Sequence, residues 1–353
     1  MTATGLAPVW ASPLALFQIM KASLHDLQTA FKQFQLAYTA ARIGLPDALA
    51  QGARTSDDLA DTLAIPANRL NRLLRAMVWA GYLELHPDAA YALTDSGREL
   101  ISSTPNSPVG GLIFQGRFFY QAWGGLFDYI KNGKIPYETA HGVRIFDQLV
   151  DDPDLANAFN GGFAARTAEY SAEIARLPVF ANARRLVDIG GGDGRLLLDI
   201  LAELPAARGV VFDLPILQTD AAKAIAASPA GDRCTFAAGD LFQSIPDAAD
   251  LYLLKWVVHD WEDERAVRLL RNVAARLQDG AKLILIERLM PDALADMMPL
   301  VQPDMNMLCL NGGGERTRAE YAALLHAAGL KLTAIEPIEN PYGFVVMIAE
   351  APR

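Results

Sequence analysis

The chain has 353 residues and a formal net charge of −10, because 31 lysines and arginines face 41 aspartates and glutamates. An acidic chain without a long basic run is a poor candidate for nucleic-acid binding, and its two cysteines, Cys234 and Cys309, lie beside neither a CxxC pair nor a histidine cluster, so we expect no disulfide framework and no metal site. Pro8 and Pro13 interrupt the apolar N-terminal segment and no stretch is long enough to span a membrane, so we expect a cytoplasmic protein without a signal peptide.

The first part of the chain, residues 14 to about 180, is expected to be mostly helical. The segment from Leu24 to Ala50 carries large apolar residues at helical spacing, and Gly44 and Pro46 are expected to divide it into two helices. Helices with so little polar surface usually bury against a partner. We therefore expect a homodimer formed through this part of the chain.

The next unit has the order of a winged helix-turn-helix. Thr55–Asp58 caps a first helix, residues 68–80 form a second amphipathic helix, and short strands follow at 82–85 and 91–93. One interpretation is DNA binding through arginines of the second helix, namely Arg69, Arg72 and Arg75. We favour a structural module, because the surrounding chain is acidic and an enzyme-like domain follows.

From Arg184 onward apolar runs alternate with helical stretches, which predicts an α/β fold with a mostly parallel sheet covered by helices. The strands are expected near 185–189, 209–213, 234–238, 250–255, 281–287, 331–337 and 343–349. The helices are expected near 194–204, 218–228, 262–278 and 317–329. Only a short turn separates the last two strands, so they should form an antiparallel hairpin at one edge.

A glycine-rich loop is the strongest local signal. The apolar strand 186–189 enters Gly190-Gly191-Gly192-Asp193-Gly194, and a helix follows. Glycine lets the backbone turn sharply and approach a ligand. Asp213 ends the next strand and can accept hydrogen bonds from two ribose hydroxyls. A dinucleotide fingerprint fails because Arg195 stands where the third glycine belongs, so the G-x-G-x-G pattern favours a nucleoside ligand without a phosphate.

A third signal follows the third strand, at Gly239-Asp240-Leu241-Phe242. An acid at the carboxyl end of a central strand lies where an open sheet binds its ligand. Asp240 can accept from an adenine amino group, while Leu241 and Phe242 offer apolar contact to the ring.

Together these segments resemble the cofactor motifs of the caffeic-acid-type class I S-adenosylmethionine-dependent O-methyltransferases. The resemblance continues through residues 254–261 and 313–317, and the helical N-terminal part resembles that family's dimerisation domain. It implies a Rossmann-like seven-stranded methyltransferase sheet with an N-terminal, mostly helical winged-helix dimerisation domain. We place the dimerisation domain at 1–105, a helical linker region that contributes to the substrate pocket at 106–180, and the catalytic domain at 181–353.

The resemblance also implies the chemistry, which is methyl transfer from S-adenosyl-L-methionine, without a metal, to a hydroxyl of a small aromatic molecule, leaving S-adenosyl-L-homocysteine. A phenol with a pKa near ~10 is mostly protonated at neutral pH, so a general base is needed. His259, just beyond the strand 250–255, matches the family's base. Glu287 and Glu315 match positions that orient its imidazole, although Glu315 can instead pair with Arg316 or cap the helix that follows.

Further roles are implied by position in the family. The cofactor should contact a set of residues spread over the motifs, namely Thr167, Gly190, Gly192, Asp213, Leu214, Asp240, Leu241, Phe242, Lys255 and Trp256. The methyl acceptor should contact Phe163, Asp260, Met305 and Asn306. Asp193 can either face the cationic sulfonium or cap the following helix. An aromatic cluster, Phe114, Phe118, Phe119 and Trp123, can close the pocket or pack the dimer.

Three other functions compete with this interpretation. A winged-helix regulator that senses a nucleoside-like ligand is disfavoured by the acidic charge and by the His259–Glu287 pair. An NAD-dependent dehydrogenase is disfavoured by Arg195. The third is an N-methyltransferase, since a ring nitrogen with a free lone pair needs no base and reacts by proximity.

Overall fold

The computed structural model describes residues 23–104, 107–152, 155–156, 167, 169–247, 249–340 and 343–352. These residues form two compact units, one up to Tyr120 and one from Gln121 onward. We describe each unit by itself. The finer division at residues 105/106 and 180/181 stays a prediction.

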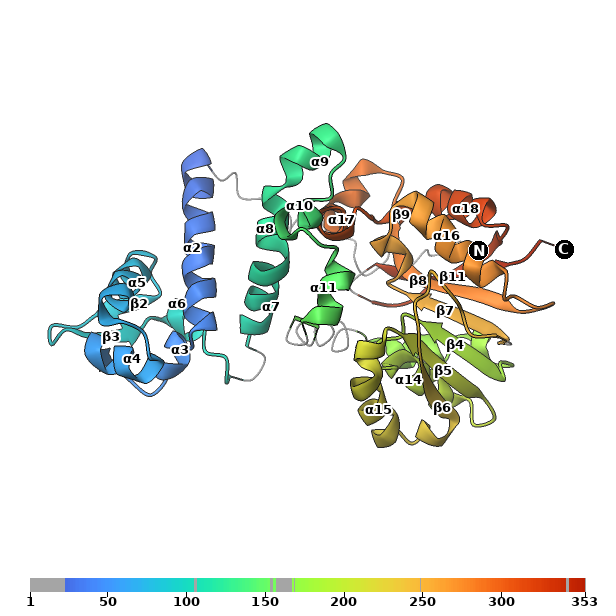
Figure 1. Cartoon of the computed structure of the whole chain (residues 1–353), viewed down its shortest axis with the longest axis horizontal. Helices are drawn as coiled ribbons and strands as arrows, with labels where there is room; N and C mark the ends of the chain where they lie inside the picture. The colour runs from blue at the N-terminus through green and yellow to red at the C-terminus, as the bar shows by residue number, and fades with distance from the viewer. Residues whose placement is uncertain are drawn as a thin grey trace, which may run out of the picture. The chain divides into compact units, whose positions relative to one another are not determined.

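The first unit is helical with a small sheet (Figure 1). Its elements are α2 (Leu24–Arg42), α3 (Leu45–Ala48), β1 (Arg54–Thr55), α4 (Ser56–Leu63), α5 (Ala67–Trp79), β2 (Leu83–Leu85), β3 (Ala90–Leu93), α6 (Asp95–Arg98), α7 (Val109–Phe114) and the π-helical turn η1 (Gln115–Phe119). Ser23 and Asp26 form a capping box that starts α2. Gly44, at φ 75°, ends it, as the sequence predicted. β3 pairs antiparallel with both β1 and β2, so the expected two helices and hairpin are present.

The second unit begins with short helices. These are α8 (Tyr120–Gly124), which starts at the boundary, α9 (Leu126–Asn132), α10 (Pro136–His141), α11 (Ile145–Asp151), α13 (Ser171–Ala175) and the 3-10 turn η2 (Pro178–Phe180). None of the helices in the described part of the chain combines the length and the apolar character needed to cross a bilayer.

The rest of the second unit is a doubly wound α/β sheet. Its strands are β4 (Arg185–Ile189), β5 (Arg208–Asp213), β6 (Cys234–Ala238), β7 (Leu251–Lys255), β8 (Lys282–Met290), β10 (Lys331–Pro337) and β11 (Phe344–Glu350), in the order β10-β11-β8-β7-β4-β5-β6. The five strands from β4 to β8 run parallel, and β11 and β10 complete an antiparallel edge, as expected. Chain order reverses between β4 and β7, and an open sheet binds its ligand at such a switch point.

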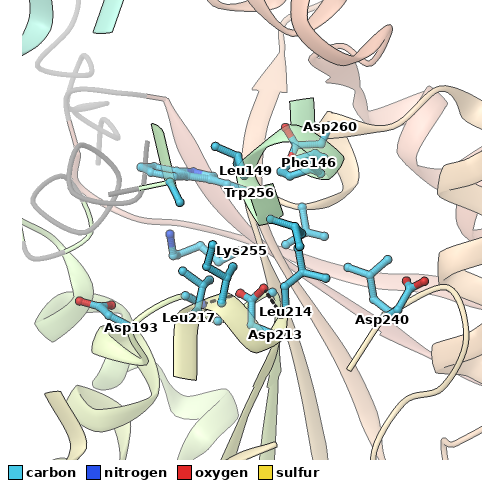
Figure 2. A pocket seen from close by; sticks show the side chains of 18 of the residues that line it. Phe146, Leu149, Asp193, Asp213, Leu214, Leu217, Asp240, Lys255, Trp256 and Asp260 are labelled. Carbon is cyan, nitrogen blue, oxygen red and sulfur yellow. Dashed lines mark hydrogen bonds between the residues drawn. The ribbon is translucent and has the colours of Figure 1, made fainter. Parts of the chain in front are cut away.

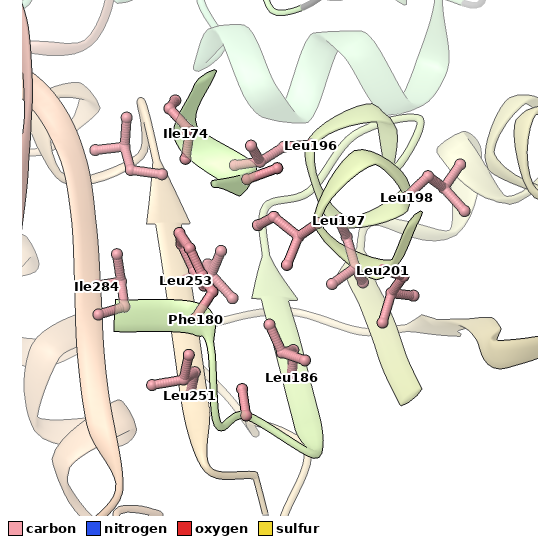
Figure 3. Close-up of a cluster of buried hydrophobic side chains, with 14 of the residues drawn as sticks. Ile174, Phe180, Leu186, Leu196, Leu197, Leu198, Leu201, Leu251, Leu253 and Ile284 are labelled. Atoms are coloured by element: carbon pink, nitrogen blue, oxygen red, sulfur yellow. The ribbon is translucent and has the colours of Figure 1, made fainter. Parts of the chain in front are cut away.

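Side chains of the central strands alternate between two apolar clusters. Leu186, Leu253 and Ile284 pack with α14 (Arg195–Glu203) on one face, together with Ile174 and Phe180 (Figure 3). The intervening residues of the same strands pack on the other face with α16 (Asp263–Ala274) and α18 (Arg318–Ala327). Burial on both faces explains why these strands read as continuous apolar runs. α15 (Gln218–Ala227) packs beside β6.

The structure adds elements that the sequence reading missed. α17 (Leu294–Asn311) runs through Pro299 and Pro303, which sequence rules treat as helix breakers. β9 (Arg316–Thr317) pairs with an extension of β8 beyond Glu287. Both elements lie next to the loop that carries Glu315, so they position part of the site.

Candidate active site

A cavity of about 470 Å³ lies at the carboxyl ends of the central strands (Figure 2). The glycine loop after β4, Asp213 and Leu214 after β5, the turn after β6 and the segment after β7 all line it. Residues of α11 form another part of the wall. The strands thus bring together three motifs that lie far apart in the sequence.

Asp213 is held against the glycine loop. Its Oδ2 accepts from the Gly192 N–H at 2.8 Å and its Oδ1 from the Leu214 N–H at 2.7 Å. Gly190 and Gly192 have φ values of 68° and 62°, which a residue with a Cβ rarely adopts. Burial raises the pKa of Asp213, while these two N–H groups oppose the rise. A carboxylate in this place suits a ribose diol.

Asp193 takes part in two features of the loop. Its Oδ1 accepts from the Arg195 N–H at 3.1 Å, at the start of α14, and the residue also lines the cavity. The two expectations for this residue are therefore compatible.

An aromatic wall lies beside Asp240. The Phe242 and Trp261 rings meet edge to face at 4.7 Å, and the Arg265 guanidinium lies 4.5 Å from each ring centroid. Asp240 Oδ1 accepts from the Phe242 N–H at 2.8 Å, which fixes the turn. A flat heteroaromatic ring fits such a wall.

The lining also includes residues that the sequence gave no reason to select. Phe146 of α11 lies 5.2 Å from the Trp261 ring, and Leu149 and Val150 follow on the same helix. No motif links α11 to the strands. Among these lining residues the sequence did offer a signal for Arg265. It stands four residues after Trp261, near the start of a helix.

Lys255 and Trp256 leave β7 in an unusual conformation. Trp256 has φ 56°, a strained value for an aromatic residue, and the Lys255 ammonium lies 3.9 Å from its ring centroid. Burial lowers the pKa of Lys255 to about 8, against the opposing effect of Asp188. Both residues line the cavity, as does the buried Thr167. Phe163 lies outside the described residues.

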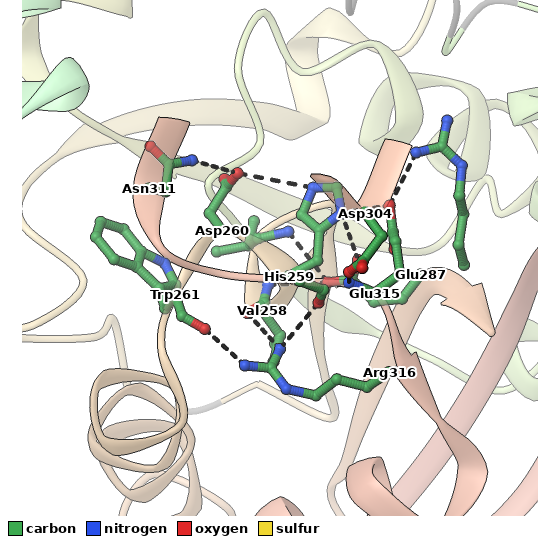
Figure 4. Close-up of polar contacts among 12 residues, drawn as sticks. Val258, His259, Asp260, Trp261, Glu287, Asp304, Asn311, Glu315 and Arg316 are labelled. Carbon is green, nitrogen blue, oxygen red and sulfur yellow. Dashed lines mark hydrogen bonds and ion pairs between the residues drawn. The ribbon is translucent and has the colours of Figure 1, made fainter. Parts of the chain in front are cut away.

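His259 is buried among carboxylates (Figure 4). It lies in the 3-10 turn η5 (Val258–Asp260), and its Nδ1 is 3.3 Å from Glu315 Oε1 and 3.8 Å from Glu287 Oε2. Its Nε2 is 3.7 Å from Asp260 Oδ1, which also accepts from the Asn311 amide at 3.0 Å. Both His259 and Asp260 line the cavity.

The two glutamates differ in what they hold. Glu315 bonds the imidazole itself, and its Oε1 also accepts from Arg288 Nη1 at 2.9 Å. Glu287 Oε1 instead accepts from the N–H groups of Val257 and Val258, at 3.1 and 2.8 Å. Glu287 thus holds the backbone of the turn, whereas the sequence analysis expected both glutamates to orient the imidazole.

The structural alternatives for Glu315 are wrong. Arg316 donates to Asp263, and to the Val258 and Trp261 carbonyls on either side of His259. The cap of α18 comes from Thr317 and Glu320, which form a capping box. Glu315 therefore neither pairs with Arg316 nor caps α18, and it faces the imidazole.

The pKa values of this cluster move in opposite directions. Burial alone lowers the pKa of His259, but Glu315, Glu287 and Asp260 outweigh it and raise the pKa to about 9. Burial raises the pKa of Asp260 to about 7 and also raises that of Glu287. Burial likewise acts to raise the pKa of Glu315, but His259 and Arg288 outweigh it, so the net pKa is lowered. Because an ionised carboxylate only accepts, the contact with Glu315 places a hydrogen on Nδ1 of His259.

Met305 and Asn306, on α17, are not among the cavity-lining residues of the described chain. Asn306 accepts from the Trp123 indole N–H at 2.9 Å. Phe114 packs with Phe118 and Phe119 in the first unit, at 4.7 and 5.5 Å. Within the described residues no group of three or more His, Cys, Asp or Glu side chains could hold a metal ion.

Comparison with known proteins decides the family. Residues 123–331 match the O-methyltransferase domain, and residues 25–103 match the O-methyltransferase dimerisation domain. The chain belongs to the O-methyltransferase family. This O-methyltransferase uses S-adenosyl-L-methionine as methyl donor, in a family that needs no metal. Its dimerisation domain supports assembly as a homodimer.

The relatives come from natural-product biosynthesis. O-methyltransferase SfmM3 of Streptomyces lavendulae is 34% identical over 85% of this chain and 92% of its own. 8-Amino-8-demethylriboflavin N,N-dimethyltransferase of Streptomyces davaonensis is 30% identical over 91% and 92%. An O-methyltransferase from neocarzinostatin biosynthesis, solved with S-adenosyl-L-homocysteine and 1,4-dihydroxy-2-naphthoic acid, has 28% identity, a TM-score of 0.78, and coverage of 89% and 95%.

The cavity fits this donor. Asp213 suits the ribose diol, the wall of Phe242 and Trp261 suits the adenine, and Lys255 and Thr167 lie in the same cavity. The bound donor supplies an activated methyl group on a cationic sulfur. The residues of the chain have to bind this donor and to orient the methyl acceptor toward it.

Proposed function

We propose that this enzyme methylates a hydroxyl of a small aromatic molecule, a secondary metabolite, with His259 as the general base. The observation that carries this proposal is the imidazole at the cavity wall, with Nδ1 bonded to Glu315 and Nε2 not engaged by that carboxylate. A general base of this kind is worth about 10²–10⁴-fold in rate. The aromatic lining and the naphthoic acid in the neocarzinostatin relative support an aromatic acceptor.

In this proposal the other residues serve the base or the donor. Glu315 fixes the tautomer of His259, Glu287 fixes its turn, and Asp260 contacts the methyl acceptor beside Nε2. Met305, Asn306 and Phe163 stay predicted acceptor contacts. We also propose that the ten residues predicted to contact the cofactor, of which Thr167 is the first in the chain and Trp256 the last, bind S-adenosyl-L-methionine.

A second candidate is methylation of a nitrogen. The riboflavin-type N,N-dimethyltransferase, at 30% identity over 91% of this chain, favours it. A nitrogen with a free lone pair needs no base and reacts by proximity and orientation. Such a reaction makes no use of a base, so the imidazole bonded to Glu315 at the cavity wall favours the first candidate.

Radiolabelled S-adenosyl-L-methionine with a panel of phenols, quinones and N-heterocycles tests the proposal. We expect the label on the oxygen of a phenolic compound, located by mass spectrometry of the product. Transfer to N-heterocycles alone would contradict the proposal and support the second candidate.

A further inference from the structure

Arg288 follows Glu287 on β8 and has no role in the function proposed so far. Its side chain is largely buried, and its guanidinium lies 4.9 Å from the Phe344 ring centroid. Its Nη1 donates to Glu315 Oε1 at 2.9 Å. The same oxygen lies 3.3 Å from Nδ1 of His259, and Figure 4 shows Glu315 beside His259. One carboxylate oxygen is therefore shared between an arginine and the imidazole.

The neighbouring glutamate has no such cation. One oxygen of Glu287 accepts hydrogen bonds from two backbone N–H groups, and the other lies 3.8 Å from Nδ1 of His259. In the part of the chain that the structure describes, no lysine or arginine forms an ion pair with Glu287. Glu315 therefore differs from Glu287 in two contacts, the hydrogen bond to His259 and the ion pair with Arg288. His259 and then Arg288 outweigh burial and lower the pKa of Glu315, whereas burial raises the pKa of Glu287.

The charges around His259 are mostly negative. The titratable and charged groups that face it or its direct partners are Asp260 on its own turn, Lys255 on β7, Glu287 and Arg288 on β8, Asp304 on α17, Glu315 and Arg316 near β9, and Tyr321 on α18. The guanidinium of Arg316 is engaged by Asp263 and by backbone carbonyls. Arg288 instead contacts Glu315, the carboxylate that bonds the imidazole of His259.

We propose that Arg288 is a positioning residue for the base: it keeps Glu315 as the acceptor of the Nδ1 hydrogen of His259, and so leaves Nε2 to take the proton of the methyl acceptor. This inference rests on the proposed role of His259. The guanidinium also offsets part of the negative charge around the ring. A nearby cation disfavours the imidazolium, so Arg288 widens the pH range over which His259 is neutral.

The sign of the effect follows from this charge. Removing a fixed cation raises the affinity of the whole cluster for protons, whichever group takes them. In Arg288→Met the ascending limb of kcat against pH should therefore move to higher pH, by roughly one unit. Arg288→Lys keeps the charge, although not the planar fork, so its limb should stay near that of the unmodified enzyme.

A third variant reverses the sign. Glu315→Gln removes the negative charge beside Nδ1, so its limb should move to lower pH while kcat falls, because the tautomer is no longer fixed. Arg276→Met is a matched control. It removes an arginine whose ion pair with Asp247 lies away from the cluster, so its limb should not move.

Two measurements separate this inference from the proposed function. The first is kcat against pH with the acceptor found in the panel, and the second is the titration midpoint of His259 by NMR of histidine-labelled protein. The chain has 5 histidines, and His259→Ala identifies the signal. We expect both the limb and the midpoint to rise in Arg288→Met and to be restored in Arg288→Lys.

Each failure has its own signature. If the limb and the midpoint stay in place in a folded Arg288→Met, or if Arg288→Lys shifts as far as Arg288→Met does, Arg288 is only structural and the inference is wrong. If Arg288→Met moves the NMR midpoint while His259→Ala keeps its activity, the inference about the cluster stands and the proposed base is wrong.

Discussion

At this site, the roles of Glu287 and Glu315 follow from the hydrogen bonds that their carboxylate oxygens accept. The family resemblance selected His259, Glu287 and Glu315, and the structure brings their three side chains together. It could not show that Glu315 contacts the imidazole while Glu287 accepts from the backbone of the turn. That division depends on distances of 3.3 and 3.8 Å to one nitrogen, which no spacing rule supplies.

Glu287 should matter for stability as well as for rate. Glu287→Ala leaves the Val257 and Val258 N–H groups buried without an acceptor, at about 1–3 kcal/mol each, so the free energy of unfolding should fall by roughly 2–6 kcal/mol. Glu287→Gln keeps a carbonyl oxygen and should cost less than half as much. Denaturant titration measures both.

A glutamate at the end of the neighbouring strand β11 is the matched control. Glu350 is partly exposed and pairs with Lys282, so Glu350→Gln should change the free energy of unfolding by less than about 0.5 kcal/mol. If Glu287→Ala were as harmless as Glu350→Gln, Glu287 would not hold the turn.

Among the elements, the loop before β9 packs directly against the turn that carries His259. The Gly314 N–H donates to the His259 carbonyl at 2.9 Å, and a Cβ on Gly313 would lie 2.1 Å from that oxygen. The loop therefore packs against the backbone of the turn that carries His259, with no room for a side chain at Gly313.

Gly313→Ala should displace the turn that carries His259. We expect kcat to fall about 10–100-fold, because small displacements of a catalytic group are costly, while the affinity for S-adenosyl-L-methionine changes little. Gly124→Ala, on α8, meets nothing within 4 Å and should leave kcat unchanged. Steady-state kinetics and calorimetry give the two quantities, and a fully active Gly313→Ala would show that the close packing is irrelevant.

Strand positions were predictable here because both faces of the sheet are buried, which makes β4, β5 and β7 continuous apolar runs. α17 was not, because Pro299 and Pro303 predict breaks and only tertiary packing shows that the helix continues. The contribution of α11 to the cavity was also hidden, since nothing local to Phe146 or Leu149 points to a ligand.

At the scale of the whole molecule, the first unit exposes apolar side chains that a partner has to cover. Leu24, Leu27 and Phe31 of α2 are 80%, 55% and 49% exposed in the single chain, within the dimerisation domain at residues 25–103 or next to it. Exposed apolar patches of this kind mark interaction surfaces. The sequence predicted this surface from its apolar helical spacing alone.

Light scattering should report a mass of about twice 38.2 kDa at micromolar concentration. Phe31→Glu should weaken the dimer, since a charge would then be buried at the interface. Lys223→Glu introduces the same charge on the exposed face of α15 and should leave the mass unchanged. A monomer in the unmodified protein, or an unaffected dimer in Phe31→Glu, would contradict this assignment of the interface.

The positive charge of the bound donor should affect the pKa of His259. Glu315, Glu287 and Asp260 outweigh burial and raise the pKa of His259 to about 9. A cationic sulfonium bound in the same cavity disfavours the imidazolium. The pKa in the working complex should therefore lie below about 9, and the rate should rise with pH up to that value and then level off.

The most direct test of the account is kcat against pH for the unmodified enzyme and for His259→Ala, with one phenolic acceptor. For the unmodified enzyme we expect an ascending limb of unit slope, because one proton must leave the cluster before the imidazole can act. For His259→Ala we expect a kcat at least about a hundredfold lower, without that limb, and a nearly unchanged affinity for S-adenosyl-L-methionine. A His259→Ala enzyme that keeps most of its activity, with the pH dependence of the unmodified enzyme, would contradict the account.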